Sequence, residues 1–304
     1  MLPRLLAILL ALSTVSFAGI SDDVRGTLAR SDPAAAESEL QNYRAHQGVT
    51  PDYVEALSWM ARASLQSNQL DRAETFAGQT EALSHQLLAK RPLDTDPHLA
   101  TALGAALEVR AQVLAARGER AQAVALLRRS LITYRNTPIQ SRLQKNLNVL
   151  ALAGQPAPPL TTAPFLGSKP APLAQFKGSP VLLFFWAHWC PDCKAEGPLI
   201  ARLRSEFASR GLIFVAPTQL YGYTAGGEDA QPKEELPYIE QVWQHFYPGL
   251  QGVPVPVSKE NFKTYGASTV PTIAVVDRAG RVSLYHPGAM PYEELRSAIE
   301  KAIR

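Results

Sequence analysis

The pattern of apolar and polar positions divides the chain into two parts. Between residues 21 and 153 the pattern is helical throughout, and alanine, leucine, arginine and glutamine dominate the composition. Three helix starts are marked by a capping side chain before a proline suited to the first helical turn. They are Asp32-Pro33, Thr50-Pro51 and Asp96-Pro97. We therefore expect residues 19–153 to form an all-helical domain.

A weak internal repeat lies within this helical part. Residues 57–73 align with residues 107–123, and in each copy a helix ends at a turn residue, Asn68 or Gly118. An alanine follows five positions later in both copies, as in tetratricopeptide repeats, which this pattern resembles. The offset between the copies exceeds the family period of about 34 residues. Helical hairpins of a repeat-like kind are the preferred prediction, and an irregular helical bundle is the alternative.

A proline-rich stretch at residues 154–159 ends the helical pattern, because proline cannot continue a helix. Beyond it, apolar runs typical of buried strands alternate with helical segments, and a hairpin and a final helix follow. This order predicts an α/β domain with a mixed central sheet over residues 154–304. The expected strands are 181–186, 212–216, 272–277 and 281–285, and the expected helices are 191–210, 233–246, 259–265 and 292–303.

The first 18 residues have the composition of a secretory signal peptide. Arg4 supplies a positive charge, residues 5–12 form an apolar core, and Ser16-Phe17-Ala18 ends in the small residues of a cleavage site. The apolar run is short for a membrane span, which needs roughly 20 residues. We expect cleavage after Ala18 and an exported protein, periplasmic or in the cell envelope. An uncleaved membrane anchor is the alternative.

Composition narrows the classes of function. The formal net charge is +3 and the basic residues form no tract, so a nucleic-acid partner is not expected. Two cysteines are present, Cys190 and Cys193 in the run Trp-Cys-Pro-Asp-Cys. A bridge across so short a loop removes little chain entropy, so stabilisation is a poor reason for the pair. The spacing therefore favours redox chemistry.

The cysteine pair falls between a predicted strand and a predicted helix. Cys190 is thus expected at the helix N-terminus, where unpaired N–H groups and the helix dipole favour a thiolate. Cys193, one turn into the helix, is expected to be more buried and to resolve a mixed disulfide formed by Cys190. A metal site would have at most three ligands, even with His188, so neither metal nor cofactor is expected.

The run from Phe184 to Cys193, with Glu196-Gly-Pro198 and Val270-Pro-Thr272 further on, resembles the thioredoxin superfamily. It is most similar to the exported TlpA/ResA-like reductase branch, over roughly residues 155–304. The resemblance implies that Pro271 is a cis-proline beside the disulfide. It also implies that the backbone of Val270 pairs with an extended substrate segment.

Other residues near the cysteines have expected supporting roles. Trp189 is expected to shield the redox pair, while Pro191, which has no N–H, and Asp192, which adds negative charge, disfavour a strong oxidant. His188 is equally compatible with a positive neighbour and with a surface loop residue. Residues 218–252 look like an insertion that either lines a substrate groove or decorates the surface.

Glu196 is a candidate proton carrier. Thioredoxin has an acidic residue in the strand before its motif, and Phe184 stands in the matching position here. Glu196 follows Cys193 by three residues and could replace that acid if burial disfavours its charged form. The alternative is a solvated glutamate on the helix face.

These observations predict an exported thiol–disulfide oxidoreductase that reduces protein disulfides in the envelope. A membrane electron donor of the DsbD/CcdA type is a candidate partner, and some relatives act in cytochrome c maturation. One alternative is a helical-repeat protein that binds a partner and carries an accessory redox domain. The other is a thiol peroxidase, although Ala187 stands where peroxiredoxins have threonine.

Overall fold

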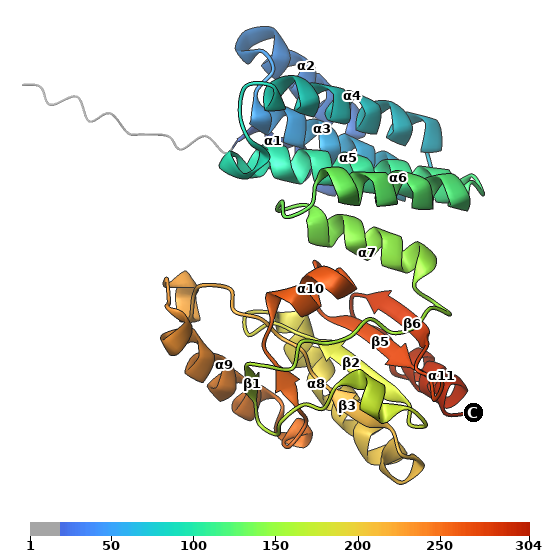
Figure 1. The fold of residues 1–304 in the computed structure, drawn as a ribbon. Coiled ribbons are helices and arrows are strands. Elements are labelled where there is room, and N and C mark those ends of the chain that lie inside the picture. Colours follow the sequence, from blue (N-terminus) through green and yellow to red (C-terminus); the bar gives the residue numbers. More distant parts are fainter. Residues whose placement is uncertain (1–18) are drawn as a thin grey trace, which may run out of the picture.

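The computed structural model describes residues 19–304, so the predicted signal peptide lies outside the described residues (Figure 1). The N-terminal half is all-helical, as predicted, and its helices pack around two apolar cores. Its helices are α1 (Ile20–Ala29), α2 (Pro33–Gln47), α3 (Pro51–Gln66), α4 (Leu70–Leu88), α5 (Pro97–Ala116), α6 (Arg120–Thr133) and α7 (Gln140–Ala151).

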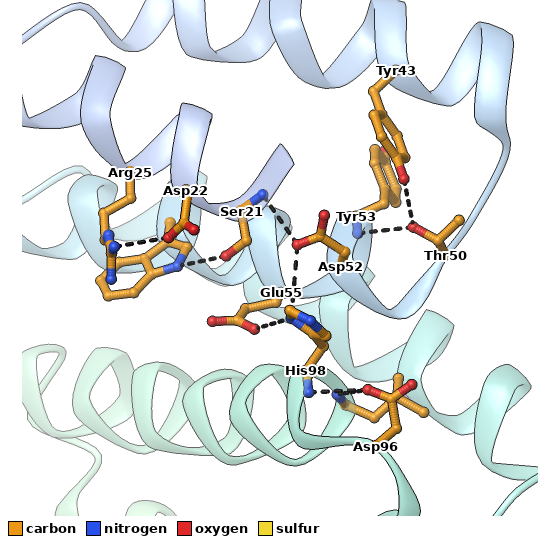
Figure 2. Close-up of polar contacts among 12 residues, drawn as sticks. Ser21, Asp22, Arg25, Tyr43, Thr50, Asp52, Tyr53, Glu55, Asp96 and His98 are labelled. Carbon is orange, nitrogen blue, oxygen red and sulfur yellow. Dashed lines mark hydrogen bonds and ion pairs between the residues drawn. The ribbon is translucent and has the colours of Figure 1, made fainter. Parts of the chain in front are cut away.

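The predicted capping residues begin three of these helices. The side chains of Asp32 and Thr50 accept hydrogen bonds from backbone N–H groups at the starts of α2 and α3. Asp96 caps α5 through two N–H groups in the same way (Figure 2). Since each cap satisfies donors that the helix leaves unpaired, the sequence pattern locates these helix starts well.

Polar contacts also tie the first helices together. Asp52 on α3 accepts the N–H of Ser21 from α1 at 3.2 Å, and His98 on α5 lies 2.7 Å from Glu55 on α3 (Figure 2). Burial lowers the pKa of His98, but the neighbouring carboxylates, chiefly Glu55, outweigh it, and the net pKa is raised.

Two helical hairpins correspond to the two copies of the sequence repeat. Asn68 and Gly118 adopt positive φ values of 55° and 83° at the turns, and Ala73 and Ala123 are fully buried. The helix pairs are α3–α4 and α5–α6, which pack against each other. Helix α5 is long and apolar enough to cross a membrane, yet much of its surface is buried by the helices around it. Membership of the tetratricopeptide family stays a prediction.

The C-terminal half contains a mixed four-stranded sheet in the order β3-β2-β5-β6. The central strand β2 runs parallel to β3 and antiparallel to β5, and β6 is antiparallel to β5. A short antiparallel pair, β1 (Phe165–Leu166) with β4 (Val255–Pro256), forms a second small sheet, and backbone hydrogen bonds join β4 to the residues just after β3. The strands of the main sheet are β2 (Val181–Phe185), β3 (Ile213–Val215), β5 (Thr272–Val276) and β6 (Val282–Pro287).

Helices cover both faces of this sheet, as the alternating pattern predicts. One face packs its apolar side chains against α8 (Pro191–Phe207), α9 (Pro232–Phe246) and α11 (Tyr292–Ile303). The other face packs against α10 (Lys259–Tyr265). Strand β2 is buried along its whole length, which explains its continuous apolar run.

Helix α7 joins the two halves (Figure 1). It packs against α10 and β6, and the Asn148 side chain donates to the Tyr265 carbonyl oxygen at 2.9 Å. The Tyr285 hydroxyl donates to the same carbonyl at 2.7 Å. A Cβ atom on Gly266 would lie 2.2 Å from the backbone nitrogen of Lys145. The two backbone segments therefore approach so closely that only glycine fits at position 266.

Candidate functional site

The two cysteines lie where β2 leads into α8. Cys190 is the N-cap residue of α8, and its sulfur accepts the backbone N–H of Cys193 at 3.0 Å. The two sulfurs are joined in a disulfide, and both residues are buried. The N–H contact and the helix N-terminus would both stabilise negative charge on the Cys190 sulfur after reduction.

The turn before β5 lies beside the Cys190 sulfur. The Val270–Pro271 peptide bond is cis, as expected, and the Val270 carbonyl oxygen lies 3.6 Å from the Cys190 sulfur. The sulfur carries no proton in the disulfide, so this distance describes a contact. A backbone group at this place is available to a polypeptide that approaches Cys190, which is the geometry of strand addition.

Glu196 lies inside α8, one turn after Cys193, and its side chain is buried. A carboxylate oxygen accepts the Met290 N–H at 3.1 Å. Burial raises the pKa of Glu196, the Met290 N–H lowers it, and Asp192 raises it further, so the pKa stays above its ordinary value. The carboxyl is therefore not the solvated group of the alternative interpretation. Its role as a proton carrier stays a prediction.

The other predicted residues surround the disulfide. Pro191 and Asp192 form the first turn of α8 and are exposed, and Trp189 is 44% exposed with its ring edge against Tyr221. Phe184 is buried in the core between the sheet and α8. Proton transfer therefore cannot use the position that thioredoxin uses.

His188 is buried, so the interpretation as a surface loop residue is wrong. It is 1% exposed, and its Nε2 lies 3.3 Å from a carboxylate oxygen of Glu235 on α9, which is also 1% exposed. Burial lowers the pKa of His188, while Glu235 opposes the shift and Lys194 adds to it. The net pKa of His188 is lowered, chiefly by burial, which disfavours the positive neighbour of Cys190 that the sequence allowed.

Glu235 also binds the backbone of the segment that follows β3. It accepts the N–H groups of Tyr221 at 2.6 Å and Gly222 at 2.8 Å. The rings of Tyr221, Tyr223 and Tyr238 lie with their centroids 5.3 to 5.4 Å from that of His188. The segment of residues 218–252 is therefore packed against the loop that carries Cys190.

Sequence reasoning missed Glu235, Tyr223 and Tyr238. The only signal in the sequence was the aromatic character of the segment, since Glu235 resembles the exposed glutamates around it on α9. Within residues 19–304, no group of three or more histidine, cysteine, aspartate or glutamate side chains has the arrangement of a metal site.

Comparison with known proteins finds similar sequences for the C-terminal half of the chain. Residues 172–303 match the family model described as a thioredoxin-like domain. The thiol-disulfide oxidoreductase ResA of Bacillus thuringiensis subsp. konkukian is 29% identical over 150 residues, which cover 49% of this chain and 77% of the relative. The thioredoxin-like protein YneN of Bacillus subtilis is 27% identical over 148 residues, which cover 48% and 78%.

A solved structure is similar over the same share of the chain. It is a thiol:disulfide interchange protein of the thioredoxin family from Chlorobium tepidum TLS, with a TM-score of 0.38 and 23% identity. The match covers 49% of this chain and 97% of that one. The family match begins after α7, so it leaves the helical half unassigned.

Proposed function

We propose that the protein is an exported thiol–disulfide oxidoreductase that reduces disulfides of envelope proteins, because residues 172–303 match the thioredoxin-like domain model and the relatives of this region include thiol-disulfide oxidoreductases. One observation carries the proposal. The Cys190 sulfur caps α8, accepts the Cys193 N–H and lies against the carbonyl oxygen of Val270 beside a cis-proline. A nucleophile, a resolving group and a backbone edge for a substrate are thus gathered within one small site.

The reaction begins from the reduced pair. The Cys190 thiolate attacks one sulfur of a substrate disulfide, the substrate S–S bond breaks, and the other substrate sulfur leaves and takes up a proton. Cys193 then loses its proton and attacks the Cys190 sulfur, which releases the second substrate thiolate. Two electrons pass to the substrate, and its two sulfurs take up the proton lost by Cys193 and one proton from solvent. The Cys190–Cys193 disulfide is the oxidised product. A dithiol donor returns the two electrons, and a membrane donor of the DsbD/CcdA type fits that role.

Glu196 acts in this scheme as the acceptor for the Cys193 proton. Its buried carboxyl follows Cys193 by one helical turn, and burial raises its pKa toward that of a thiol, which suits a proton acceptor for Cys193. In Glu196→Gln, the pH dependence of Cys193 reactivity should lose one ionisation. The test is the rate of alkylation of Cys193 against pH in a Cys190→Ser background. An unchanged profile would contradict the role.

The residues between the cysteines support the proposed reducing direction of electron flow. Pro191 has no N–H to donate to the thiolate, and the Asp192 carboxylate repels it. Both effects destabilise the reduced thiolate form, and strong oxidants depend on stabilising that form. A redox titration should therefore place the pair well below the potential of DsbA-type oxidants, about −120 mV. A value near that limit would indicate an oxidase.

The main test uses the whole protein with insulin and dithiothreitol. We expect catalysed insulin reduction, its loss in Cys190→Ser, and mixed disulfides with substrates that accumulate in Cys193→Ser. Consumption of hydrogen peroxide without insulin reduction would favour the thiol peroxidase instead. Export is tested separately, because cleavage after Ala18 gives a mature protein whose first residue is Gly19. N-terminal sequencing of protein recovered from the envelope checks that position.

A further inference from the structure

A cleft of about 270 Å³ lies between the helical half and the end of the sheet that carries the redox site. Helices α5 and α7 supply one wall, with Glu108, Gln112, Lys145 and Val149 among its residues. Thr269 and Pro287 supply the other wall. We call this space the α5–α7 cleft.

The cleft is continuous with the edge at which a substrate would meet Cys190. Thr269 immediately precedes Val270, whose carbonyl oxygen contacts the Cys190 sulfur. Pro287 pairs with Thr272 where β5 begins, at the same end of the sheet. An extended chain advances about 3.3 Å per residue, so a segment paired beside Val270 reaches the cleft within a few residues.

The two walls are held at a fixed spacing. The side chain of Asn148 is bonded to the Tyr265 carbonyl, and Gly266 packs directly against the backbone of Lys145. These contacts lie between α7 and the end of α10, a few residues before Thr269. A binding site with fixed walls loses little conformational entropy when it is occupied, so the cleft can bind a ligand without rearranging.

The chemistry of the helical wall suits a polypeptide. Glu108 accepts a hydrogen bond from Lys145 at 2.8 Å, so these two charges compensate each other. The Gln112 and Asn146 amides lie beside them, with Nε2 of Gln112 donating to Oδ1 of Asn146 at 3.0 Å. Val149 is 51% exposed and adds an apolar surface. The donors of these two amides are bonded within the protein, since Gln112 also donates to Glu108 and Asn146 donates to the Arg142 carbonyl oxygen. The Gln112 carbonyl oxygen can accept a backbone N–H and the apolar patch can hold a side chain, with little net charge, as is typical of peptide recognition.

We propose that the α5–α7 cleft binds the segment of a polypeptide substrate that flanks its disulfide. The proposal rests on the proposed function and assigns part of the substrate site to the helical half, through Gln112 and Val149. The helical half thereby selects substrates that are disulfide-bonded polypeptides over small disulfides, which end before they reach the cleft.

The experiment compares Val149→Asp with Ile132→Asp in the full protein. Both substitutions place a carboxylate on an exposed position of the helical half, but Ile132 is 79% exposed on α6 and does not line the cleft. The assays are insulin reduction and reduction of 5,5′-dithiobis(2-nitrobenzoate), a small disulfide. For insulin, we expect Val149→Asp to raise KM about tenfold with little change in kcat, the size expected for one central interface contact. Ile132→Asp should match the wild type.

Reduction of the small disulfide distinguishes this proposal from the proposed function. It should be equal in the wild type, Val149→Asp and Ile132→Asp, because none of these changes touches the sulfurs. Gln112→Ala should raise the insulin KM in the same direction by a smaller factor. Equal insulin KM values in Val149→Asp and Ile132→Asp would overturn the cleft as a substrate site. A wild-type protein that reduces neither disulfide would instead overturn the proposed function.

Discussion

The contact between Glu235 and the loop before Cys190 makes a strong prediction about stability. Glu235 is almost completely buried and accepts two backbone N–H groups, from Tyr221 and Gly222, while it also faces His188. The perturbation is Glu235→Gln, which keeps the shape of the side chain and removes its charge. We expect a marked loss of stability, because the buried donors were placed for a carboxylate.

The magnitude follows from the two hydrogen bonds. Each N–H bond to a charged group contributes about 1.5–3 kcal/mol, whereas a neutral bond contributes about 1 kcal/mol. The glutamine oxygen can replace one carboxylate oxygen, so one bond weakens. The other N–H then faces an NH₂ group and loses its acceptor. Removal of a buried charge regains part of the loss. The net decrease in the free energy of unfolding is about 2–4 kcal/mol.

Urea denaturation followed by tryptophan fluorescence measures this change. With a slope of about 2 kcal/mol per molar urea, the midpoint should fall by roughly 1–2 M while the slope stays constant. Glu240→Gln is the matched control, because Glu240 lies on the same helix, α9, and is exposed. A substitution at such a surface position should change stability by less than about 0.5 kcal/mol.

A double-mutant cycle with His188→Gln then separates the contact between His188 and Glu235 from the backbone contacts. Residues that contact each other show coupling of at least about 0.5 kcal/mol, whereas independent residues do not. If Glu235→Gln and Glu240→Gln had equal midpoints, the buried carboxylate would not hold residues 221 and 222, and the reasoning would be refuted.

Three further changes test other parts of the fold. Gly266→Ala should loosen the contact between the halves, because its Cβ atom would overlap the backbone of Lys145, and limited proteolysis after α7 should become faster. Burial raises the pKa of Glu196 above 4.5, so its ionisation costs the folded state stability as pH rises. Glu196→Gln should therefore be more stable than the wild type at pH 8 in urea titrations, with the advantage lost at pH 4. The raised pKa of His98 has the opposite effect on stability, because protonated His98 beside Glu55 stabilises the folded state and this stabilisation is lost as the pH rises. The cost of His98→Gln should be larger at pH 5.5 than at pH 8.

Features that depend on neighbouring residues could be read from the sequence. The caps at Asp32, Thr50 and Asp96 each bond a backbone N–H three residues later, and the two cysteines lie one helical turn apart. Patterns of neighbouring residues are therefore enough to predict them. The sheet was predictable because the apolar run of β2 and the hairpin of β5 and β6 are also local patterns. The helix predicted from residue 233 begins at Pro232, a difference of one residue.

The remaining features depend on contacts between distant residues. Glu235 meets His188 across the segment that follows β3, and no local pattern distinguishes Glu235 from its exposed neighbour Glu234. The sequence shows only that the proline-rich stretch ends the helical pattern, yet in the structure Gly154 donates to the carbonyl oxygen of Val282 and so lies along β6. Whether such a residue is buried or exposed depends on where it lies in the folded protein and not on its residue type.

The same distinction separates the chemistry of this protein from its choice of substrate. The reactive sulfur of Cys190 needs little more than a helix N-terminus and a nearby second cysteine, both of which are local. Its surroundings come from two distant segments. One carries the tyrosines around His188, of which Tyr221 also contacts Trp189, and the other is the helical half that faces Thr269 across the α5–α7 cleft. In the proposed mode of binding, a substrate that approaches Cys190 contacts surfaces that the redox motif does not specify. Substitutions on those surfaces should change which disulfides are reduced before they change how fast a small disulfide reacts.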